Sequence, residues 1–100
     1  MNFTQKVWAA CKKIPKGRVS TYALIAKAVG NPRASRAVGN ALNKNRSKSV
    51  PCHRVVKSDG KVGGFALGSK AKEKLLKRES VRIIRGRVQQ FVKAVFKGKK

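Results

Sequence analysis

Two short helical segments joined by a tight turn restrict the possible folds of this chain more than any other feature. The first begins at Ser20 or Thr21 and ends at Gly30, a residue that commonly follows the last turn of a helix. Asn31-Pro32 comes next and suits the start of a second helix, which runs to about Lys44. Two short helices separated by a glycine-containing turn are typical of a helix-turn-helix, although any helical hairpin can produce this pattern.

The second of these helices is unusually rich in small residues. Gly39 lies in its middle, where glycine costs about 1 kcal/mol relative to alanine, and Ala37 lies close by. Close packing against another helix of the same protein explains such residues. Close approach to a DNA groove explains them as well, and the nearby Arg33 and Arg36 favour this second interpretation modestly.

The remaining segments place one helix before this pair and several elements after it. Thr4 suits the N-cap of the first helix. Ser58-Asp59-Gly60 is a hairpin turn signal, after which Lys61-Val62 would return as the second strand of a wing. Ser69 can cap a further helix, and apolar spacing predicts a terminal helix over residues 84–96. We therefore expect a mainly α fold, with a compact winged helix-turn-helix-like three-helix core, a small β-hairpin wing and extra C-terminal helices.

The charge balance narrows the choice of partner. The chain carries 26 Lys and Arg against 3 Asp and Glu, a formal net charge of +23 at pH 7, and such a surface calls for a polyanion. Double-stranded DNA is the first candidate. A membrane is not expected, because the basic residues are spread along the chain, no run is long enough to span a bilayer, and no signal peptide is evident. We expect a cytoplasmic, nucleoid-associated protein, or a nuclear one in a eukaryote.

The length of 100 residues predicts a single domain over residues 1–100, and the 41% hydrophobic content is enough to fill one core. Cys11 lies on the apolar face of the first helix, where a role as a small core residue is much more common than a redox role. Cys11, Cys52 and the single histidine number three, fewer than the four ligands of a structural zinc site. We therefore expect no metal and no other cofactor.

The segment V-P-C-H-R-V-V, residues 50–56, places Cys52 beside the only histidine, His53. Its β-branched flanks predict a strand, and successive residues of a strand point to opposite faces. A direct pair of the two side chains therefore needs a bend, which Pro51 can help to make, or a bridging water. An imidazole that acts as a base also needs a third group to orient it.

Few acidic residues are available for that third position. Asp59 is explained by its turn, and Glu73 can form a helical ion pair with a lysine one turn later. Glu79 lies near the end of its helix, where a negative charge is unfavourable. It either neutralises a neighbouring arginine or orients His53, and the residues alone leave both roles open.

The stretch P-C-H-R-V, residues 51–55, resembles the active-site signature of the O6-alkylguanine-DNA alkyltransferases, also called methylated-DNA–protein-cysteine methyltransferases. The resemblance covers roughly residues 3–84 in the same order. K-G-R-V-S-T-Y-A-L-I-A and N-P-R-A-S-R-A-V-G-N-A-L are similar to the helix-turn-helix region, and G-G-F-A-L-G and K-E-K-L-L-K-R-E to the substrate loop and the helix after it. Residues 85–100 would then be a basic C-terminal helical extension, and the N-terminal domain that many relatives carry is not expected.

The resemblance implies a DNA repair reaction that ends on the protein itself. Cys52 would take the alkyl group from O6-alkylguanine, such as O6-methylguanine, irreversibly and in a single turnover. His53 would act on the Cys52 sulfur through a water, and Glu79 would hold His53. Asn45 would brace the turn between the recognition helix and the active site. The target base would be flipped out of the duplex, because its reacting atom is unreachable inside the stack.

The resemblance also assigns DNA contacts and pocket walls to a monomeric protein. The recognition helix would enter the minor groove, Tyr22 would press on the target phosphate, and Arg36 would replace the flipped nucleotide. The DNA-contacting residues would be Tyr22, Arg33, Arg36, Ala37, Gly39 and Arg54, and the pocket would be lined by Tyr22, Val55, Phe65 and Ala66. Phe65 stands where the family commonly has tyrosine and Ala66 where many members have serine, so two hydroxyl groups are missing.

Two alternative functions stay open at this point. An alkyltransferase-like protein would bind the lesion with weak or no transfer, and Phe65 is compatible with that function. A basic helix-turn-helix DNA-binding protein would explain the charge and the helices, but it would leave the P-C-H-R-V stretch and Glu79 without a role.

Overall fold

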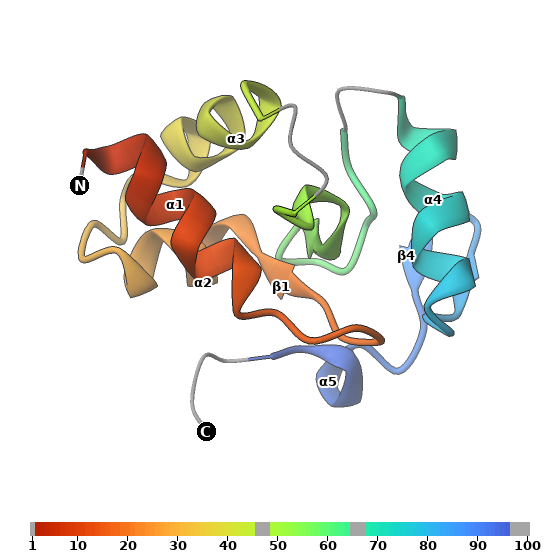
Figure 1. Cartoon of the computed structure of the whole chain (residues 1–100). Coiled ribbons are helices and arrows are strands. Elements are labelled where there is room, and N and C mark those ends of the chain that lie inside the picture. Colours follow the sequence, from red (N-terminus) through yellow and green to blue (C-terminus); the bar gives the residue numbers. More distant parts are fainter. Residues whose placement is uncertain (1, 46–48, 65–67, 97–100) are drawn as a thin grey trace.

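The computed structural model describes residues 2–45, 49–64 and 68–96 and is mainly helical (Figure 1). The elements in chain order are α1 (Phe3–Lys12), β1 (Ser20–Thr21), α2 (Tyr22–Ala28), α3 (Ser35–Asn43), the 3-10 turn η1 (Cys52–Arg54), β2 (Val55–Val56), α4 (Ser69–Arg78), β3 (Ile83–Ile84), β4 (Arg87–Val88) and α5 (Phe91–Ala94). Helices α1, α2 and α3 contact one another, and α4 packs against η1 on the other side of the molecule. The predicted helical fold with a helix-turn-helix is therefore confirmed.

Helix α1 begins two residues earlier than the predicted cap at Thr4. Asn2 caps it instead: its side chain accepts a hydrogen bond from the Gln5 backbone N–H, and the Gln5 side chain accepts one from the Asn2 backbone. This reciprocal arrangement satisfies two backbone N–H donors. A cap at Thr4 would satisfy only one, because the residue three positions later is Val7, which has no acceptor in its side chain. The shift extends the helix without changing its buried face, which carries Val7 and Cys11.

The helix-turn-helix follows the sequence signals at α2 but not at the start of α3. The Thr21 side chain caps α2 by accepting the backbone N–H of Leu24 at 3.0 Å. Gly30 takes a φ of +86° after the last turn, a backbone conformation that L side chains rarely adopt. Helix α3 begins only at Ser35, not at the predicted Asn31-Pro32, because those residues form a turn in which the Ala34 N–H donates to the Asn31 carbonyl at 3.0 Å. From there α3 packs against α1 and α2.

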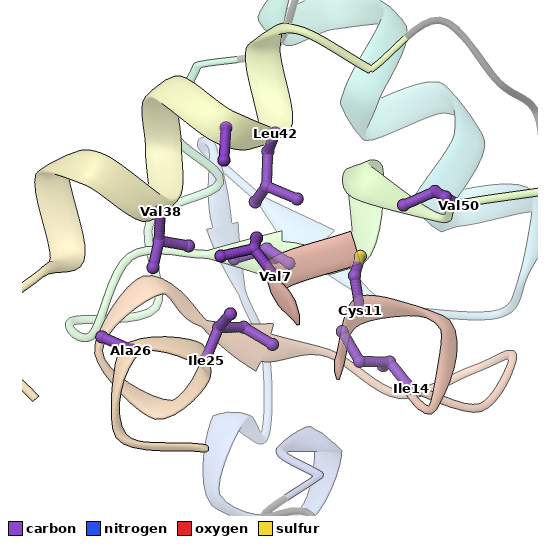
Figure 2. Packing of buried hydrophobic residues seen from close by; sticks show 10 residues of the cluster. Val7, Cys11, Ile14, Ile25, Ala26, Val38, Leu42 and Val50 are labelled. Carbon is purple, nitrogen blue, oxygen red and sulfur yellow. The ribbon is translucent and has the colours of Figure 1, made fainter. Parts of the chain in front are cut away.

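One hydrophobic cluster joins the three helices (Figure 2). Val7 and Cys11 of α1, Ile25 of α2 and Val38 of α3 meet inside it, and all are almost fully buried. The Trp8 indole N–H donates to the Ala41 carbonyl at 2.9 Å and fixes α1 against α3. The Cys11 side chain lies in the apolar interior, as the sequence predicts.

Strands β1 and β2 form a short parallel pair between the helix-turn-helix and η1. Ser20 is paired with Val55, and Thr21 with Val56. All four residues are buried. Because α2 starts directly after β1 and β2 starts directly after η1, this pairing places the start of α2 close to η1.

The predicted β-hairpin wing is wrong in its pairing. The turn at residues 58–60 does form, with the Lys57 N–H donating to the Lys61 carbonyl and the Gly60 N–H to the Lys57 carbonyl, both at 2.9 Å. The returning segment, however, pairs with β4, because Lys61 bridges Arg87 and the Val62 N–H donates to the Gly86 carbonyl at 2.8 Å. The two-stranded antiparallel hairpin in the described part of the chain is β3–β4.

The predicted terminal helix over residues 84–96, and with it the helical extension from residue 85, is also corrected. Its first part is the β3–β4 hairpin, which turns at Arg85 and Gly86, both with positive φ. Burial here follows strand alternation: Ile83 is buried and Ile84 is 55% exposed. Helix α5 is limited to four residues, Phe91–Ala94. Apolar residues spaced four apart fit both a helix and a hairpin, so periodicity alone could not separate them.

The segment after α5 is attached to the start of β1. The Val19 N–H donates to the Ala94 carbonyl at 2.9 Å, and the Phe96 N–H donates to the Val19 carbonyl at 2.7 Å. The Arg18 guanidinium donates to the carbonyls of Ala94 and Val95 at 3.1 and 2.7 Å. The C-terminal part of the described chain is thus an integral layer of the fold.

Candidate active site

Cys52 and His53 lie on the 3-10 turn η1, not on a strand as predicted. The Cys52 N–H donates to the Val50 carbonyl at 2.8 Å and the Arg54 N–H to the Pro51 carbonyl at 2.9 Å, so the chain coils here and becomes extended only at Val55. Consecutive side chains of such a turn diverge by about a third of a turn rather than pointing to opposite faces. The expected bend after Pro51 is therefore present.

The Cys52 sulfur is held at the C-terminal end of α3. The Asn45 side-chain amide donates to Cys52 Sγ at 3.1 Å and to the Val50 carbonyl at 3.3 Å. The Cys52 thiol lies 3.6 Å from the Leu42 carbonyl. Asn45 therefore connects the C-terminal end of α3 to the turn that carries the cysteine.

The pKa values of Cys52 and Cys11 are shifted in opposite directions by the contact between the two thiols. Hydrogen bonding with Cys11 is the main cause that lowers the pKa of Cys52 to about 7; burial opposes it, and Asn45 and the charge of Lys72 reinforce it. The pKa of Cys11 is raised, first by the same hydrogen bond and then by burial. Figure 2 shows the Cys11 sulfur pointing toward η1. The buried thiol keeps its proton, and the half-buried Cys52 is the sulfur that becomes a thiolate near neutral pH.

Replacing Asn45 with alanine is expected to raise the pKa of Cys52 by about one unit, because a donor to the thiolate is lost. Ultraviolet absorbance of the thiolate, followed against pH, measures this change, since Cys11 ionises far higher. Asn40→Ala, at an exposed position of α3, is the matched control. An unchanged titration in Asn45→Ala would contradict the assigned role of the amide.

Glu79 lies beside His53. This contact agrees with one of the two roles that the sequence left open for Glu79, namely to orient His53. Glu79 caps the C-terminus of α4, and its Oε1 lies 3.1 Å from Nε2 of His53, although the ring is not aligned for a linear hydrogen bond. Burial lowers the pKa of His53, and the neighbouring Glu79 opposes that effect without overcoming it. His53 is therefore a neutral imidazole at neutral pH, the form that can accept a proton.

Arg54 does not face the surface, contrary to its predicted contact with DNA. Its Nε and Nη2 donate to the two carboxylate oxygens of Glu79 at 2.9 and 2.6 Å, and its Nη1 donates to the Ile14 carbonyl at 2.8 Å. Three of the five N–H donors of the guanidinium are used inside the protein, and the side chain is only 16% exposed, so its fixed position favours Glu79 over a phosphate. Arg54 belongs to the interior of the site.

A small pocket of about 80 Å³ opens beside Cys52. Its walls are Tyr22, Gly39, Leu42, Asn43, Cys52 and Gly64. A methyl group added to Gly39 would make ordinary contact with the Tyr22 ring at 3.8 Å. Packing inside the protein therefore tolerates a side chain at this position, and the glycine leaves space in the pocket instead. Val55, predicted to line the pocket, is fully buried in the core beneath it.

Lys72 lies at the site although the sequence did not reveal it, because a lysine in a basic helix is expected on the surface. It is 1% exposed, and its ammonium donates to the Gly64 carbonyl at 3.0 Å and to the Tyr22 hydroxyl oxygen at 3.3 Å. The ammonium also lies 5.6 Å from the centre of the Tyr22 ring. Because ammonium only donates, the Tyr22 hydroxyl must accept from it and is left to donate its own hydrogen elsewhere.

The pKa of Lys72 predicts a specific rise of stability in alkaline solution. Burial lowers this pKa from 10.5 to about 8. Between these values the unfolded chain binds the proton that the folded protein has released, so stability increases with pH. Thermal denaturation of the wild type relative to Lys72→Met is expected to show a gain of about 2 kcal/mol between pH 8 and 10. Lys70→Met, an exposed position of the same helix, should parallel the wild type, and equal pH slopes in all three proteins would contradict the prediction.

The remaining predicted site residues fall into two groups. Arg33, two residues before α3, and Arg36 and Ala37, in its first turn, are exposed and available to a partner. Phe65 and Ala66 lie outside the described residues. Within the described ranges, the helices are too short or too polar to cross a membrane.

A larger groove of about 860 Å³ lies between α1 and α2. It is lined by apolar side chains of both helices, by Phe96 and by three lysines, Lys6, Lys13 and Lys27. None of the predicted site residues faces it, so the chemistry is assigned to the smaller pocket at Cys52.

The fold and the site together define a helix-turn-helix DNA-binding domain with an activated cysteine behind its recognition helix. The family model described as 6-O-methylguanine DNA methyltransferase, DNA binding domain, matches residues 2–81. The chain therefore belongs to the 6-O-methylguanine DNA methyltransferase family.

Known proteins of two kinds are similar to this chain. The methylated-DNA–protein-cysteine methyltransferase of Methanosarcina acetivorans is 54% identical over 78 residues, which are 77% of this chain and 50% of that protein. The bifunctional transcriptional activator and DNA repair enzyme Ada of Escherichia coli is 43% identical over 79 residues, 78% of this chain and 22% of Ada. The chain thus spans half or less of these two curated relatives.

Solved structures agree with the fold. Atl1 of S. pombe, in complex with damaged DNA containing O6-carboxymethylguanine, superposes with a TM-score of 0.83 at 32% identity and covers 94% of both chains. OGT of Mycobacterium tuberculosis in complex with DNA gives a TM-score of 0.76 at 42% identity, over 80% of this chain and 49% of that one.

Proposed function

We propose that this protein binds alkylated duplex DNA and transfers the alkyl group from O6-alkylguanine to Cys52. The observation that carries the proposal is the Cys52 sulfur itself: its pKa is lowered to about 7, it accepts from Asn45, and it forms a wall of an open pocket. Curated relatives with the same chemistry in their names match three quarters of the chain.

The transfer is a displacement at the alkyl carbon. The thiolate of Cys52 forms the S–C bond while the C–O6 bond breaks, and the electron pair leaves with the guanine. The thiol proton passes first to His53, through a water, and Glu79 steadies the resulting imidazolium. The Tyr22 hydroxyl, which accepts from Lys72, can donate its hydrogen to the departing guanine. A thioether has no route back to the thiol, so each protein molecule reacts once.

The exposed start of α3 supplies the proposed contact with DNA. Arg33 and Arg36 stand there beside Ala37, and the pocket opens at the neighbouring Gly39. The net charge of +23 provides the non-specific attraction to phosphates. We propose that α3 enters the minor groove and that the target guanine turns out of the stack toward Cys52, with Arg36 taking its place.

A single incubation tests this function. The protein is mixed with duplex DNA that contains one O6-methylguanine, and its intact mass is measured against the same duplex with guanine. A gain of one methyl group, stoichiometric and dependent on the lesion, is expected. No lesion-dependent mass change and no preference for the lesion in binding would refute the proposal.

Lesion binding without transfer is the second candidate. The observation that favours it is the superposition with S. pombe Atl1, which extends over 94% of both chains. In the same experiment this function would give preferred binding to the modified duplex with an unchanged protein mass.

A further inference from the structure

The carboxylate of Glu79 serves two partners at once. Its Oε2 accepts from Arg54 Nη2 at 2.6 Å, whereas its Oε1 accepts from Arg54 Nε at 2.9 Å and also lies 3.1 Å from His53 Nε2. The side chains of His53, Arg54 and Glu79 are only 12–16% exposed. Because water screens charges weakly at such low exposure, a change in the charge of one of these three groups acts strongly on the other two.

The guanidinium is itself fixed. Its third nitrogen, Nη1, donates to the Ile14 carbonyl at 2.8 Å, just beyond the end of α1. All three nitrogens are engaged, two on the carboxylate and one on the backbone, and the planar fork allows one orientation of Glu79. Arg54 thus ties the end of α1 to the C-cap of α4, directly behind His53.

We propose that Arg54 is a positioning residue for the transfer: it orients Glu79 toward His53 and offsets the carboxylate charge, so that His53 stays neutral and able to accept a proton. The role of Arg54 in the transfer rests on the proposed function. Its effect on the protonation of His53 can be measured in the free protein, without DNA. The proposal also gives a role to a residue that the sequence suggested for DNA contact.

The charges around His53 support this arrangement. Glu79 favours the imidazolium, whereas Arg54 of η1 and Lys72 of α4 disfavour it, and burial disfavours it most. Without Arg54, Glu79 would keep its negative charge beside the imidazole with one opposing cation fewer. His53 would then hold its proton to higher pH and lose its capacity as a base at neutral pH.

The single histidine makes the test direct. Proton NMR titration of His53 is recorded for the wild type, Arg54→Met and Arg54→Lys, with Arg78→Met as the control at an exposed position one residue before Glu79. The midpoint in Arg54→Met is expected to rise by about one pH unit. Arg54→Lys, which keeps the charge, should stay near the wild type, as should Arg78→Met. Unchanged midpoints in a folded Arg54→Met would overturn the proposal.

Transfer kinetics test the orienting part. In Arg54→Met the acid limb of the pH–rate profile should move with the His53 midpoint, so that the rate falls by up to about tenfold on the acid side of that midpoint and recovers at higher pH. Arg54→Lys should instead lower the rate at every pH, because a lysine cannot hold the carboxylate in a fork.

A uniform loss of rate without a pH shift in Arg54→Met would show a merely structural role. If Arg54→Met does not fold, the Arg54→Lys profile decides, since a wild-type rate there would refute the orienting role. If the wild-type protein transfers no alkyl group, the proposed function is refuted, whereas the NMR result on His53 is unaffected.

Discussion

Cys52→Ala is expected to abolish the mass gain on incubation with O6-methylguanine DNA while leaving lesion binding within about threefold of the wild type. The variant removes the acceptor sulfur, and neither water nor the remaining residues can take its place in a transfer that ends on the protein. The contacts at the exposed start of α3 are untouched, so affinity for the duplex should persist. Intact-protein mass spectrometry and fluorescence anisotropy measure the two quantities on the same samples.

Cys11→Ala is the matched control for this result. It removes the second thiol of the chain, which is buried and keeps its proton, and should therefore still accept one methyl group. Its rate at neutral pH should fall, because Cys52 loses the hydrogen bond that does most to lower its pKa. A methyl group found on Cys52→Ala, or missing from Cys11→Ala, would require a different acceptor.

Deletion of residues 86–100 is expected to destabilise the fold by about 5 kcal/mol or more, close to the whole stability of a domain of this size. The deletion removes Val88 and Val95, which are 3% and 8% exposed, at about 1.5–3 kcal/mol each. It also removes the two backbone hydrogen bonds to Val19 and both carbonyl acceptors of Arg18, at about 1 kcal/mol each. Thermal denaturation should show a transition lowered by more than about 20 °C, or none at all.

Two single substitutions separate packing from chain length. Val95→Ala should cost about 2 kcal/mol, because its side chain is buried against Val19 and its neighbours. Val92→Ala, at a position 84% exposed in the same segment, should stay within about 0.5 kcal/mol of the wild type. Equal transition temperatures for the two variants would show that the C-terminal segment does not stabilise the fold.

The parts of the fold that the sequence predicted correctly depend on local signals. Thr21 and Gly30 delimit α2 because a capping side chain and a positive φ are properties of single residues. The adjacency of Cys52 and His53 was enough to single out this segment as a candidate site. Because few acidic residues are available, Glu79 could be narrowed to two roles, as partner of an arginine or of His53, and the structure places it against both His53 and Arg54.

The parts that were missed depend on contacts between distant segments. Lys72 is buried because its ammonium finds Tyr22, 50 residues earlier, and Gly64. Arg54 turns inward because Glu79 and the Ile14 carbonyl, 25 and 40 residues away, converge on it. A charged residue is expected on the surface unless its partners are known, and sequence spacing does not reveal such partners. The pairing of β4 with residues 60–62 has the same origin.

The parallel pairing of β1 with β2 makes the geometry of the pocket a matter of chain length rather than of side-chain identity. Tyr22 follows β1 directly, and Cys52 lies three residues before Val55, the first residue of β2. The positions of Tyr22 and Cys52 are therefore both set by their distance along the backbone from the β1–β2 pair. An extra residue in either interval would displace one wall by about 2–3 Å. A sequence that diverges from this one throughout its core can therefore keep the pocket, provided these two intervals keep their length.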